Sequence, residues 1–218
     1  MSTQAANYRE LVSQLPPGSR LSLYDVAWDE YDELVQQMSD TSAFRISYDN
    51  GRMQIMSPSA RHEKYKNLLH DFVLILGDEL KLEVLSYGSA TLKLKAAGKG
   101  AEADDCFYIQ HAADISTKDD IDLTRDPPPD LVVEIDLTSE SSGKFGIYSA
   151  LGVPEIWRFD GSSCEILVLS GPTYTETGFS LAFPSLQKQH ISQFVIESSK
   201  EGPRQARSKL RSWLKSRR

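Results

Sequence analysis

Two short apolar segments of the chain carry acidic side chains where a protein core needs no charge. Residues 129–136 read PDLVVEID, and residues 102–109 read EADDCFYI. Ionised carboxylates are costly to bury unless they are paired, hydrogen-bonded or bound to a metal. Acids inside apolar segments are therefore candidates for a functional site. A cluster of acids at the end of a sheet, reaching water or pairing with Arg or Lys, explains the same pattern without chemistry, and this alternative stays open.

The alternation of side chains along a strand decides which of these acids can act together. It places Asp130, Glu134 and Asp136 on one face of the first segment, and Asp104 and Asp105 on opposite faces of the second. At most one of the two adjacent aspartates can therefore point at a given site. Asp130 and Glu134 are four residues apart, about 13 Å at the usual rise of a strand, so we interpret Asp130 as part of the strand entry.

Asp104 and Glu134 can share a divalent cation if their segments are neighbouring strands. Hard cations such as Mg²⁺ prefer oxygen ligands and leave coordination places to water and phosphate. A cation held in this way can activate water and offset the charge of a phosphodiester, and a lysine can orient the attacking water. The sequence contains no His-Glu-x-x-His, no phosphate-binding glycine loop and no nucleophile elbow. The chemistry that remains is that of acids and lysines.

The composition is that of a globular protein. Of the 218 residues, 40% are hydrophobic and 25% are charged, and no apolar run approaches the roughly 18 residues of a membrane span. The N-terminus lacks a basic region followed by an apolar one, so we expect no secretory signal, no membrane partner and a cytoplasmic location. Cys106 and Cys164 are too few for a disulfide framework or a zinc site and are expected to be buried thiols.

A proline-rich turn and the distribution of charge divide the chain into three parts. The prolines of residues 15–18 (LPPG) close an N-terminal extension, residues 1–20, and the main domain is expected to span residues 21–198. Residues 199–218 form a basic tail. The whole chain has a net charge of −7, and the eight basic residues and one acid from Lys200 onward give +7, so residues 1–199 carry −14.

The basic tail allows several interpretations. A helix over residues 205–214 can contact phosphates, an acidic partner or the acidic body of the chain itself. Chain termini are usually poorly ordered, so a loose and solvated end is the interpretation that we favour.

Capping and turn signals predict the elements that precede the acidic segments. Ser22 is expected to cap a helix that runs to about Met38. The Asn50-Gly51 pair, between two alternating segments, predicts a hairpin of strands over residues 44–48 and 52–57.

A long amphipathic helix should follow this hairpin. Ser59 is expected to cap a helix over residues 61–80, whose apolar stripe faces the core. Glu63 and His70 lie on the opposite face, which is normally solvent-exposed. Near the helix start, Glu63 also complements the helix dipole.

The remaining elements form strands around a crossover. Residues 83–86 and 90–95 resemble an antiparallel strand with an irregularity at Gly88, and a long proline-rich loop occupies residues 112–129. After the first acidic segment, a helix over residues 144–151 and a strand over residues 155–159 complete a crossover, which makes a parallel strand pair plausible. A further hairpin over residues 164–169 and 174–181 and a short helix at residues 191–196 end the domain.

Several of these motifs together resemble the Uma2 family of restriction endonuclease-like proteins, which is abundant in cyanobacteria and belongs with the PD-(D/E)XK nuclease superfamily. The resemblance rests on Ala103-Asp104, on residues 129–136, on Lys144 to Tyr148 and on the family-specific block GVPEIW at residues 152–157. It runs from about residue 44 to residue 196. It implies an α/β (α+β) fold with a restriction-endonuclease-like mixed sheet flanked by helices. It also implies cleavage of DNA that depends on Mg²⁺ or Mn²⁺, and a homodimer.

The resemblance also implies roles for particular residues. Asp104 stands at the aspartate of the superfamily's Pro-Asp motif, and Glu134 stands at its second acid. Two positions after the second acid, where the superfamily has a lysine, this chain has Asp136. Lys144 on the following helix matches the displaced lysine of related proteins, and Glu63 resembles an additional acid on their first helix.

Two hypotheses from different classes follow. The first is a metal-dependent DNA endonuclease in which Asp104 and Glu134 are metal ligands, Lys144 orients water, and Asp136 is a further ligand or a partner of the lysine. The second is a catalytically inactive binding or interaction module that keeps the fold. It is motivated by Asp136 and by the charge of −14 on residues 1–199, which repels DNA.

Overall fold

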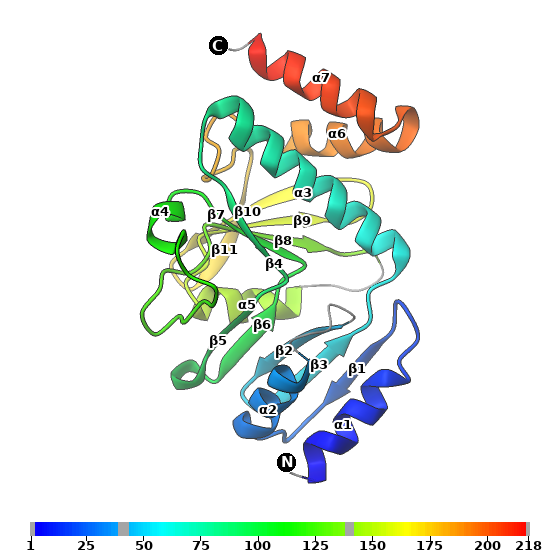
Figure 1. Cartoon of the computed structure of the whole chain (residues 1–218), viewed down its shortest axis with the longest axis vertical. Coiled ribbons are helices and arrows are strands. Elements are labelled where there is room, and N and C mark those ends of the chain that lie inside the picture. The colour runs from blue at the N-terminus through cyan, green and yellow to red at the C-terminus, as the bar shows by residue number, and fades with distance from the viewer. Residues whose placement is uncertain (1–2, 39–43, 138–141, 217–218) are drawn as a thin grey trace.

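A computed structural model of the protein describes residues 3–38, 44–137 and 142–216, and two sheets form its framework (Figure 1). The first sheet is antiparallel and consists, in spatial order, of β1 (Arg20–Leu23), β3 (Arg52–Met56), β2 (Arg45–Asp49), β6 (Lys99–Glu102) and β5 (Thr91–Leu94). The second sheet has the order β11 (Thr173–Thr177), β10 (Cys164–Ser170), β9 (Glu155–Phe159), β8 (Leu131–Ile135), β7 (Asp105–Tyr108) and β4 (Leu85–Gly88).

The second sheet is mixed, and helices cover both of its faces. Strands β8 and β9 are parallel, and the helix between them completes the predicted crossover. The other described pairs of strands are antiparallel. The expected α+β class, with a mixed sheet flanked by helices, is therefore confirmed. The helices are α1 (Thr3–Ser13), α2 (Trp28–Met38), α3 (Ala60–Leu80), α4 (Ala112–Ile115), α5 (Ser142–Ala150), α6 (Lys188–Glu201) and α7 (Pro203–Lys215), with a short 3₁₀ helix, η1 (Lys95–Ala97).

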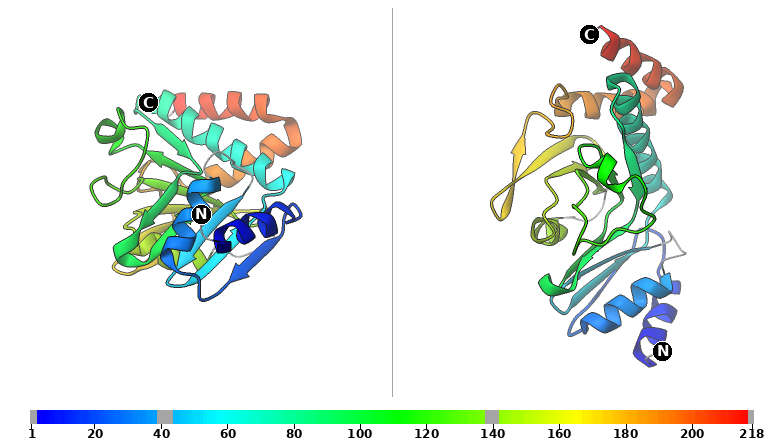
Figure 2. Two further views of the ribbon diagram at one scale, coloured as in Figure 1. Left: turned by 60° about the horizontal axis from the view of Figure 1, so that its bottom comes forward. Right: turned by 60° about the vertical axis from the view of Figure 1, so that its left-hand side comes forward.

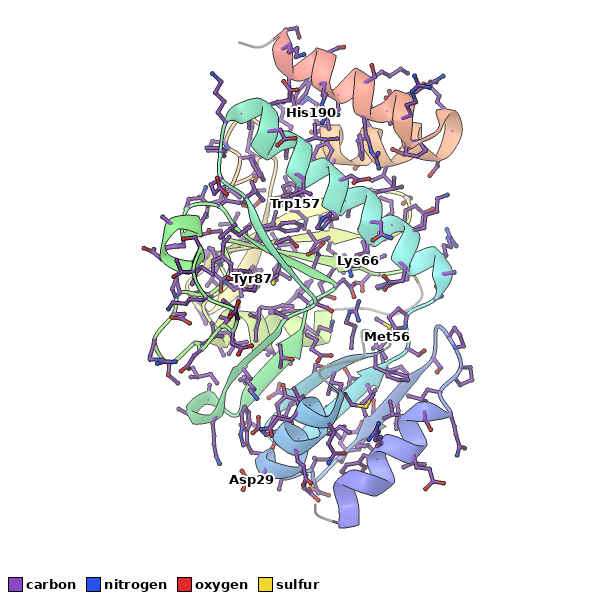
Figure 3. All side chains as sticks on the ribbon, viewed as in Figure 1. Asp29, Met56, Lys66, Tyr87, Trp157 and His190 are labelled. Carbon is purple, nitrogen blue, oxygen red and sulfur yellow. The ribbon has the colours of Figure 1, made fainter. Side chains whose placement is uncertain are left out.

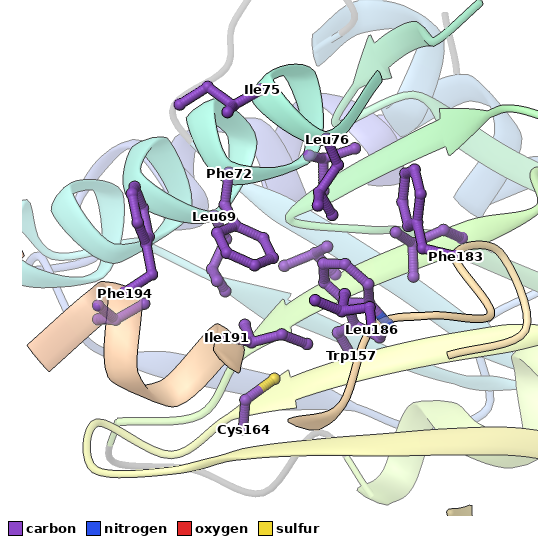
Figure 4. Close-up of a cluster of buried hydrophobic side chains, with 14 of the residues drawn as sticks. Leu69, Phe72, Ile75, Leu76, Trp157, Cys164, Phe183, Leu186, Ile191 and Phe194 are labelled. Atoms are coloured by element: carbon purple, nitrogen blue, oxygen red, sulfur yellow. The ribbon is translucent and has the colours of Figure 1, made fainter. Parts of the chain in front are cut away.

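The main core lies between the second sheet and the pair of helices α3 and α6. Phe72 of α3 contacts Trp157 of β9 edge-on, with ring centroids 6.1 Å apart, and Phe194 of α6 closes the cluster (Figure 4). Ser59 caps α3 by accepting the backbone N–H of His62 at 3.2 Å, as the sequence predicts. The apolar stripe of α3 is therefore fixed against the sheet.

A second core covers the opposite face of this sheet. Val132 and Cys106 pack there with side chains of α5 and of the first sheet. Leu131, Val133 and Ile135 belong to the main core instead. The two faces predicted for the strand that carries Glu134 are thus confirmed. Both cysteines are buried free thiols, as expected.

The predicted hairpin at Asn50-Gly51 is confirmed. Strands β2 and β3 pair in antiparallel register, and Asn50 and Gly51 have φ angles of 44° and 93°. Two-residue hairpins of this kind require positive φ at both turn positions, which Asn and Gly adopt more readily than other residues. The second predicted hairpin, β10 with β11, is confirmed as well.

The predicted start of the helix that ends at Met38 is wrong. Ser22 does not cap a helix, because it lies in β1 and pairs with Gln54 of β3. The chain then turns at Asp25, whose φ is 56°, and α2 begins at Trp28. Residues 3–13 also form a helix that the sequence analysis did not predict, and α1 packs against α2.

The second acidic segment is not one continuous strand. β6 ends at Glu102 in the first sheet, and β7 begins at Asp105 in the second, so the chain crosses between sheets at Ala103 and Asp104. The carboxylate of Asp104 accepts the backbone N–H of Ile135 at 2.8 Å, in place of a carbonyl of a continuous strand. Residues 83–86 and 90–95 are divided in the same way, since β4 and β5 belong to different sheets.

The basic tail is folded as far as Ser216, so the loose end that we favoured is wrong for the described residues. Helix α7 packs on α3 and α6, with Ala206, Leu210 and Leu214 buried (Figures 1 and 2). The alternative in which the tail binds the acidic body is confirmed by ion pairs to α3. In the described part of the chain, no helix has the length and apolar character of a membrane span.

Candidate active site

The structure brings Asp104 and Glu134 together. Strands β7 and β8 pair with Asp105 opposite Val133, and one further step of this register places Asp104 opposite Glu134. Directly opposed residues of an antiparallel pair have Cα atoms about 4.5 to 5.5 Å apart. The site therefore lies where the chain passes from the first sheet to the second.

Asp104 is fully buried, and polar groups surround its carboxylate. Its Oδ2 accepts the backbone N–H of Ile135 at 2.8 Å and lies 2.9 Å from Nε2 of His62. Its Oδ1 lies 3.6 Å from Nε of Arg45. Burial alone raises the pKa of the Asp104 carboxyl, but the His62 hydrogen bond and the Lys144 charge outweigh it and hold the pKa below its usual value. Asp104 is therefore an anion that acts only as an acceptor.

Glu134 is also buried, and two side chains of α5 hold it. Nζ of Lys144 donates to both carboxylate oxygens, at 3.1 and 3.0 Å, and the hydroxyl of Tyr148 donates to one of them. Lys144 also donates to the backbone carbonyl of Glu102 at 3.2 Å. Burial raises the pKa of Glu134 to about 7, although the Lys144 charge opposes this and the Asp104 charge adds to it.

Lys144 keeps its proton in this environment. Burial lowers the pKa of the ammonium, but the charges of Glu134 and Asp104 outweigh burial and raise it above the usual value. The ammonium is thus a fixed positive charge between the two carboxylates. The sequence resemblance selected Lys144 as the displaced lysine.

Arg45 connects Glu63 to the site. Arg45 stands at the start of β2 and is only 2% exposed. Its Nη2 lies 3.4 Å from Oε1 of Glu63, and its Nε faces Asp104. The carboxylate of Glu63 is 38% exposed, so it lies at the rim of the site and reaches Asp104 through the guanidinium.

Asp136 is paired differently from the prediction. Its carboxylate lies 3.8 Å from Nη1 of Arg158 on β9, and its backbone N–H donates to the carbonyl of Phe159. Lys144 pairs with Glu134, and the pairing of Asp136 with this lysine stays a prediction. The prediction of Asp136 as a metal ligand stays a prediction.

Asp130 has the structural role that its position predicts. Its carboxylate accepts the backbone N–H groups of Ile109 and His111, at 2.7 and 3.0 Å, and lies 2.6 Å from Nδ1 of His111. These bonds tie the start of β8 to the segment after β7. Asp130 therefore orders the strand entry.

A cavity of about 230 Å³ opens next to His62 and Ile135, two partners of Asp104. Both residues, which bond to the Asp104 carboxylate, line the cavity, together with Met56 of β3 (Figure 3). Solvent and small ligands can therefore approach the partners of Asp104 from the side of the first sheet.

Sequence reasoning missed Arg45 and His62. His62 follows the helix cap Ser59 by three residues, but its contact with Asp104 joins positions 42 residues apart. Arg45 begins an ordinary hairpin strand and carries no local signal of burial. The contribution of Tyr148 to the site could be predicted from the sequence, because Tyr148 lies four residues after Lys144 and side chains four residues apart share a helix face.

His70 lies on the face of α3 expected to be exposed, yet it contacts the sheet. Its Nδ1 is 2.7 Å from Oδ2 of Asp105, whose other oxygen accepts the hydroxyl of Ser86 at 3.1 Å. The expectation that this face is solvent-exposed is wrong at His70. Asp104 and Asp105 do point at different partners, as the alternation predicts.

We expect His70 to make stability depend on pH. The hydrogen bond to Asp105 raises the pKa of His70 above its usual value, although partial burial opposes this. A pKa raised by folding adds stability that is complete below the ordinary value of about 6.5 and is lost as pH rises through the folded-state pKa. The histidine is about one-third exposed, so the loss should be under about 1 kcal/mol.

Urea unfolding at about pH 6 and about pH 8.5 measures this effect. Wild type should lose more stability at the higher pH than His70→Gln does. Ser86→Ala is the matched control, because it removes a neutral donor from Asp105 and lowers stability equally at both pH values. A His70→Gln variant with the wild-type pH dependence would contradict the assignment.

The described part of the chain is a mixed α+β fold that buries two carboxylates, with a lysine beside one of them. Comparison with known proteins identifies its family. The chain belongs to the Uma2 family: the family model, described as "putative restriction endonuclease", matches residues 28–196. Every site residue described above lies within this range.

One solved structure that resembles the chain is the crystal structure of a "putative nuclease belonging to DUF820" from Anabaena variabilis. The two are 14% identical, the match covers 68% of this chain and 89% of the other, and the TM-score is 0.45. No curated protein matches the chain.

Proposed function

We propose that the protein is a metal-dependent endonuclease that hydrolyses DNA phosphodiester bonds. The observation that carries this proposal is the Lys144 ammonium, which contacts both oxygens of Glu134 directly opposite Asp104 in the strand register. A nuclease of this kind needs two carboxylates and one cation within reach of the same phosphate. Membership of the Uma2 family supports the same reaction class.

The donor set fits a hard divalent cation. Oδ1 of Asp104 is buried and accepts no hydrogen bond from the described residues, so its lone pairs are available to a cation. No group of three or more His, Cys, Asp or Glu side chains among the described residues is placed to hold a metal. Mg²⁺ commonly uses one or two carboxylates and completes its coordination with water and substrate phosphate. Asp104 and Glu134 would hold Mg²⁺ or Mn²⁺ here.

The residues around the two carboxylates have different roles in the proposed reaction. When bound, the cation would offset phosphate charge and make a water molecule more acidic. Lys144 would orient the attacking water and stabilise the phosphate oxygens in exchange for one of the three hydrogen bonds that its ammonium donates to Glu134 and Glu102 in this structure. Tyr148 fixes the orientation of Glu134, and Arg45 and His62 fix that of Asp104.

A catalytically inactive binding module is the alternative, and Arg45 is the observation that favours it. Its buried guanidinium already balances part of the charge of Asp104 and Glu63. The acids can therefore be stable without any metal. A fold does not determine a function, so measurement has to separate the two.

The experiment is nicking of supercoiled plasmid with Mg²⁺ or Mn²⁺, together with calorimetry of Mn²⁺ binding. We expect wild type to nick, and Glu134→Ala to lose both nicking and Mn²⁺ affinity. Glu165→Ala is the matched control, since this acid of β10 pairs with Arg158 outside the site. Nicking that survives in equally pure Glu134→Ala protein would sink the nuclease proposal. Wild type without metal affinity would support the binding module.

A further inference from the structure

We propose that the exposed basic residues Lys200, Arg204 and Lys215, at the ends of α6 and α7, bind the phosphate backbone of duplex DNA beside the site. This inference rests on the proposed function for the choice of ligand. It concerns a part of the chain outside residues 28–196, the range that the family model matches. The surface is defined by these three residues and is called the α6–α7 basic face.

Helix α7 is charged very differently from the rest of the protein. Its sequence, PRQARSKLRSWLK, contains five basic residues and no acid. The first 199 residues carry a net charge of −14, which repels a polyanion. A DNA-cleaving protein with such a body needs a local basic surface to bind its substrate.

Three of the basic residues of α7 are used to attach the helix. Arg207 pairs with Asp71 of α3, and Arg211 lies 3.5 Å from Glu79. Lys209 pairs with Glu201 at the end of α6. The two arginines offset part of the negative charge of α3, and Lys209 offsets part of that of α6.

The other two basic residues of α7, together with one lysine of α6, are left for a ligand. Lys200, Arg204 and Lys215 are exposed, and no ion pair joins them to any described residue. An isolated lysine on a surface has no special meaning. In contrast to Arg207, Lys209 and Arg211, these three cations have no acid paired with them among the described residues, so phosphate groups can offset their charge.

The face is placed to continue a DNA-binding surface from the site. The α6–α7 turn lies on the same side of the molecule as the N-terminal end of α3, where His62 and Glu63 meet the site (Figures 1 and 2). Along α3, the distance from His62 to the docking residues Asp71 and Glu79 is about 13 to 26 Å at 1.5 Å per residue. One strand of DNA advances about 3.4 Å per phosphate, so this span is about four to eight base pairs.

The spacing within the face also suits a duplex. Arg204 and Lys215 stand near opposite ends of α7, about 16 Å apart along the helix axis. Lys200 lies across the turn from Arg204. Three cations spread over such a length contact phosphates without reading bases, so the face should contribute affinity rather than sequence preference.

The test is binding of a fluorescent 20-base-pair duplex by full-length protein carrying Glu134→Gln, so that cleavage does not interfere. Anisotropy at several salt concentrations compares this protein with a triple variant, Lys200→Gln, Arg204→Gln and Lys215→Gln. Glutamine keeps good helix propensity at exposed positions. The matched control replaces three lysines elsewhere by glutamine, namely Lys95, Lys118 and Lys188.

We expect the affinity of the triple variant for the duplex to be lower by about 10-fold or more. The slope of log K against log salt concentration should become less negative by about 3, close to one unit for each lost phosphate contact. The control triple should bind like the parent. A triple variant with the parent's affinity and salt slope overturns the proposal. If that variant instead loses affinity for vesicles of anionic lipid, the face belongs to a membrane and the proposal is again overturned.

The two proposals fail separately. If wild type does not nick DNA but the triple variant binds the duplex more weakly, the basic face is a DNA contact and the nuclease proposal falls. If wild type nicks DNA and the triple variant binds and nicks normally, the nuclease stands and the basic face falls.

Discussion

Replacing Lys144 by Met should slow plasmid nicking about 100- to 1,000-fold while the protein stays folded. Among the residues that the structure describes, the Lys144 ammonium is the cation that contacts Glu134 directly, with both carboxylate oxygens within 3.1 Å. Loss of a single preorganised donor at a transition state typically costs this much in rate. The sequence resemblance also predicts that Lys144 takes the place of the superfamily's lysine, whose usual position is Asp136.

The fold should tolerate this change because Glu134 can become neutral. Its pKa is already raised to about 7 by burial, and the Lys144 charge is what opposes a higher value. Without that charge the carboxyl takes up a proton instead of staying ionised in an apolar environment. The methionine side chain occupies much of the space of the lysine stem, so no large cavity forms.

Tyr148→Phe is the matched control for Lys144→Met. Tyrosine donates to the same carboxylate from the next turn of α5, but it contributes no charge. We expect its loss to slow nicking by about 10-fold, in line with one neutral hydrogen bond. Single-turnover rates of nicking, with circular dichroism for the fold, distinguish the two variants. A Lys144→Met protein that nicks at the rate of Tyr148→Phe would show that charge at this position is dispensable.

The sequence predicts the elements of this fold well where the signals are local. Asn50-Gly51 defines its hairpin because few residue pairs adopt positive φ twice in succession. Ser59 and the apolar stripe after it define α3 for similar reasons. The prediction fails at Ser22, because a serine before a helix and a serine in an edge strand look alike until the partner strand is known.

The residues of the candidate site also differ in whether local sequence signals predict them. Glu134 and Lys144 are ten residues apart on a strand and the next helix, and acid patterning with a family motif was enough to select both residues, although their ion pair was not predicted. Arg45, His62 and Asp104 come from a hairpin strand, a helix start and the crossing between the sheets. Only the arrangement of the two sheets in space brings them together. No window of sequence contains that information.

The C-terminal helix shows why a charge count alone did not predict structure. The tail's net charge of +7 left several partners open, and a loose end was favoured because chain termini are usually poorly ordered. The acids of α3 change this balance, because Asp71, Asp78 and Glu79 face the basic residues of α7. Electrostatic docking and burial of Leu210 and Leu214 then order the segment together.

Replacing Arg45 by Met should lower the free energy of unfolding by about 3 to 5 kcal/mol. The side chain of Arg45 is 1% exposed, that of Asp104 is 0% exposed, and the guanidinium lies 3.6 Å from the carboxylate. Removing one partner of a buried ion pair leaves the other as an uncompensated charge. Asp104 retains its bonds to His62 and Ile135, but these do not replace the lost positive charge of the guanidinium.

A double-mutant cycle separates this charge effect from simple loss of packing. Asp104→Asn removes the negative charge and still lets the side-chain oxygen accept the N–H of Ile135. If the ion pair is the cause, Arg45→Met combined with Asp104→Asn should be more stable than the sum of the single changes implies, by about 1 to 3 kcal/mol. Glu63→Gln, which alters the partly exposed pair of the same arginine, should cost less than about 1 kcal/mol. Urea unfolding of the four proteins and this control gives all of these values, and strictly additive losses in the cycle would assign the role of Arg45 to packing alone.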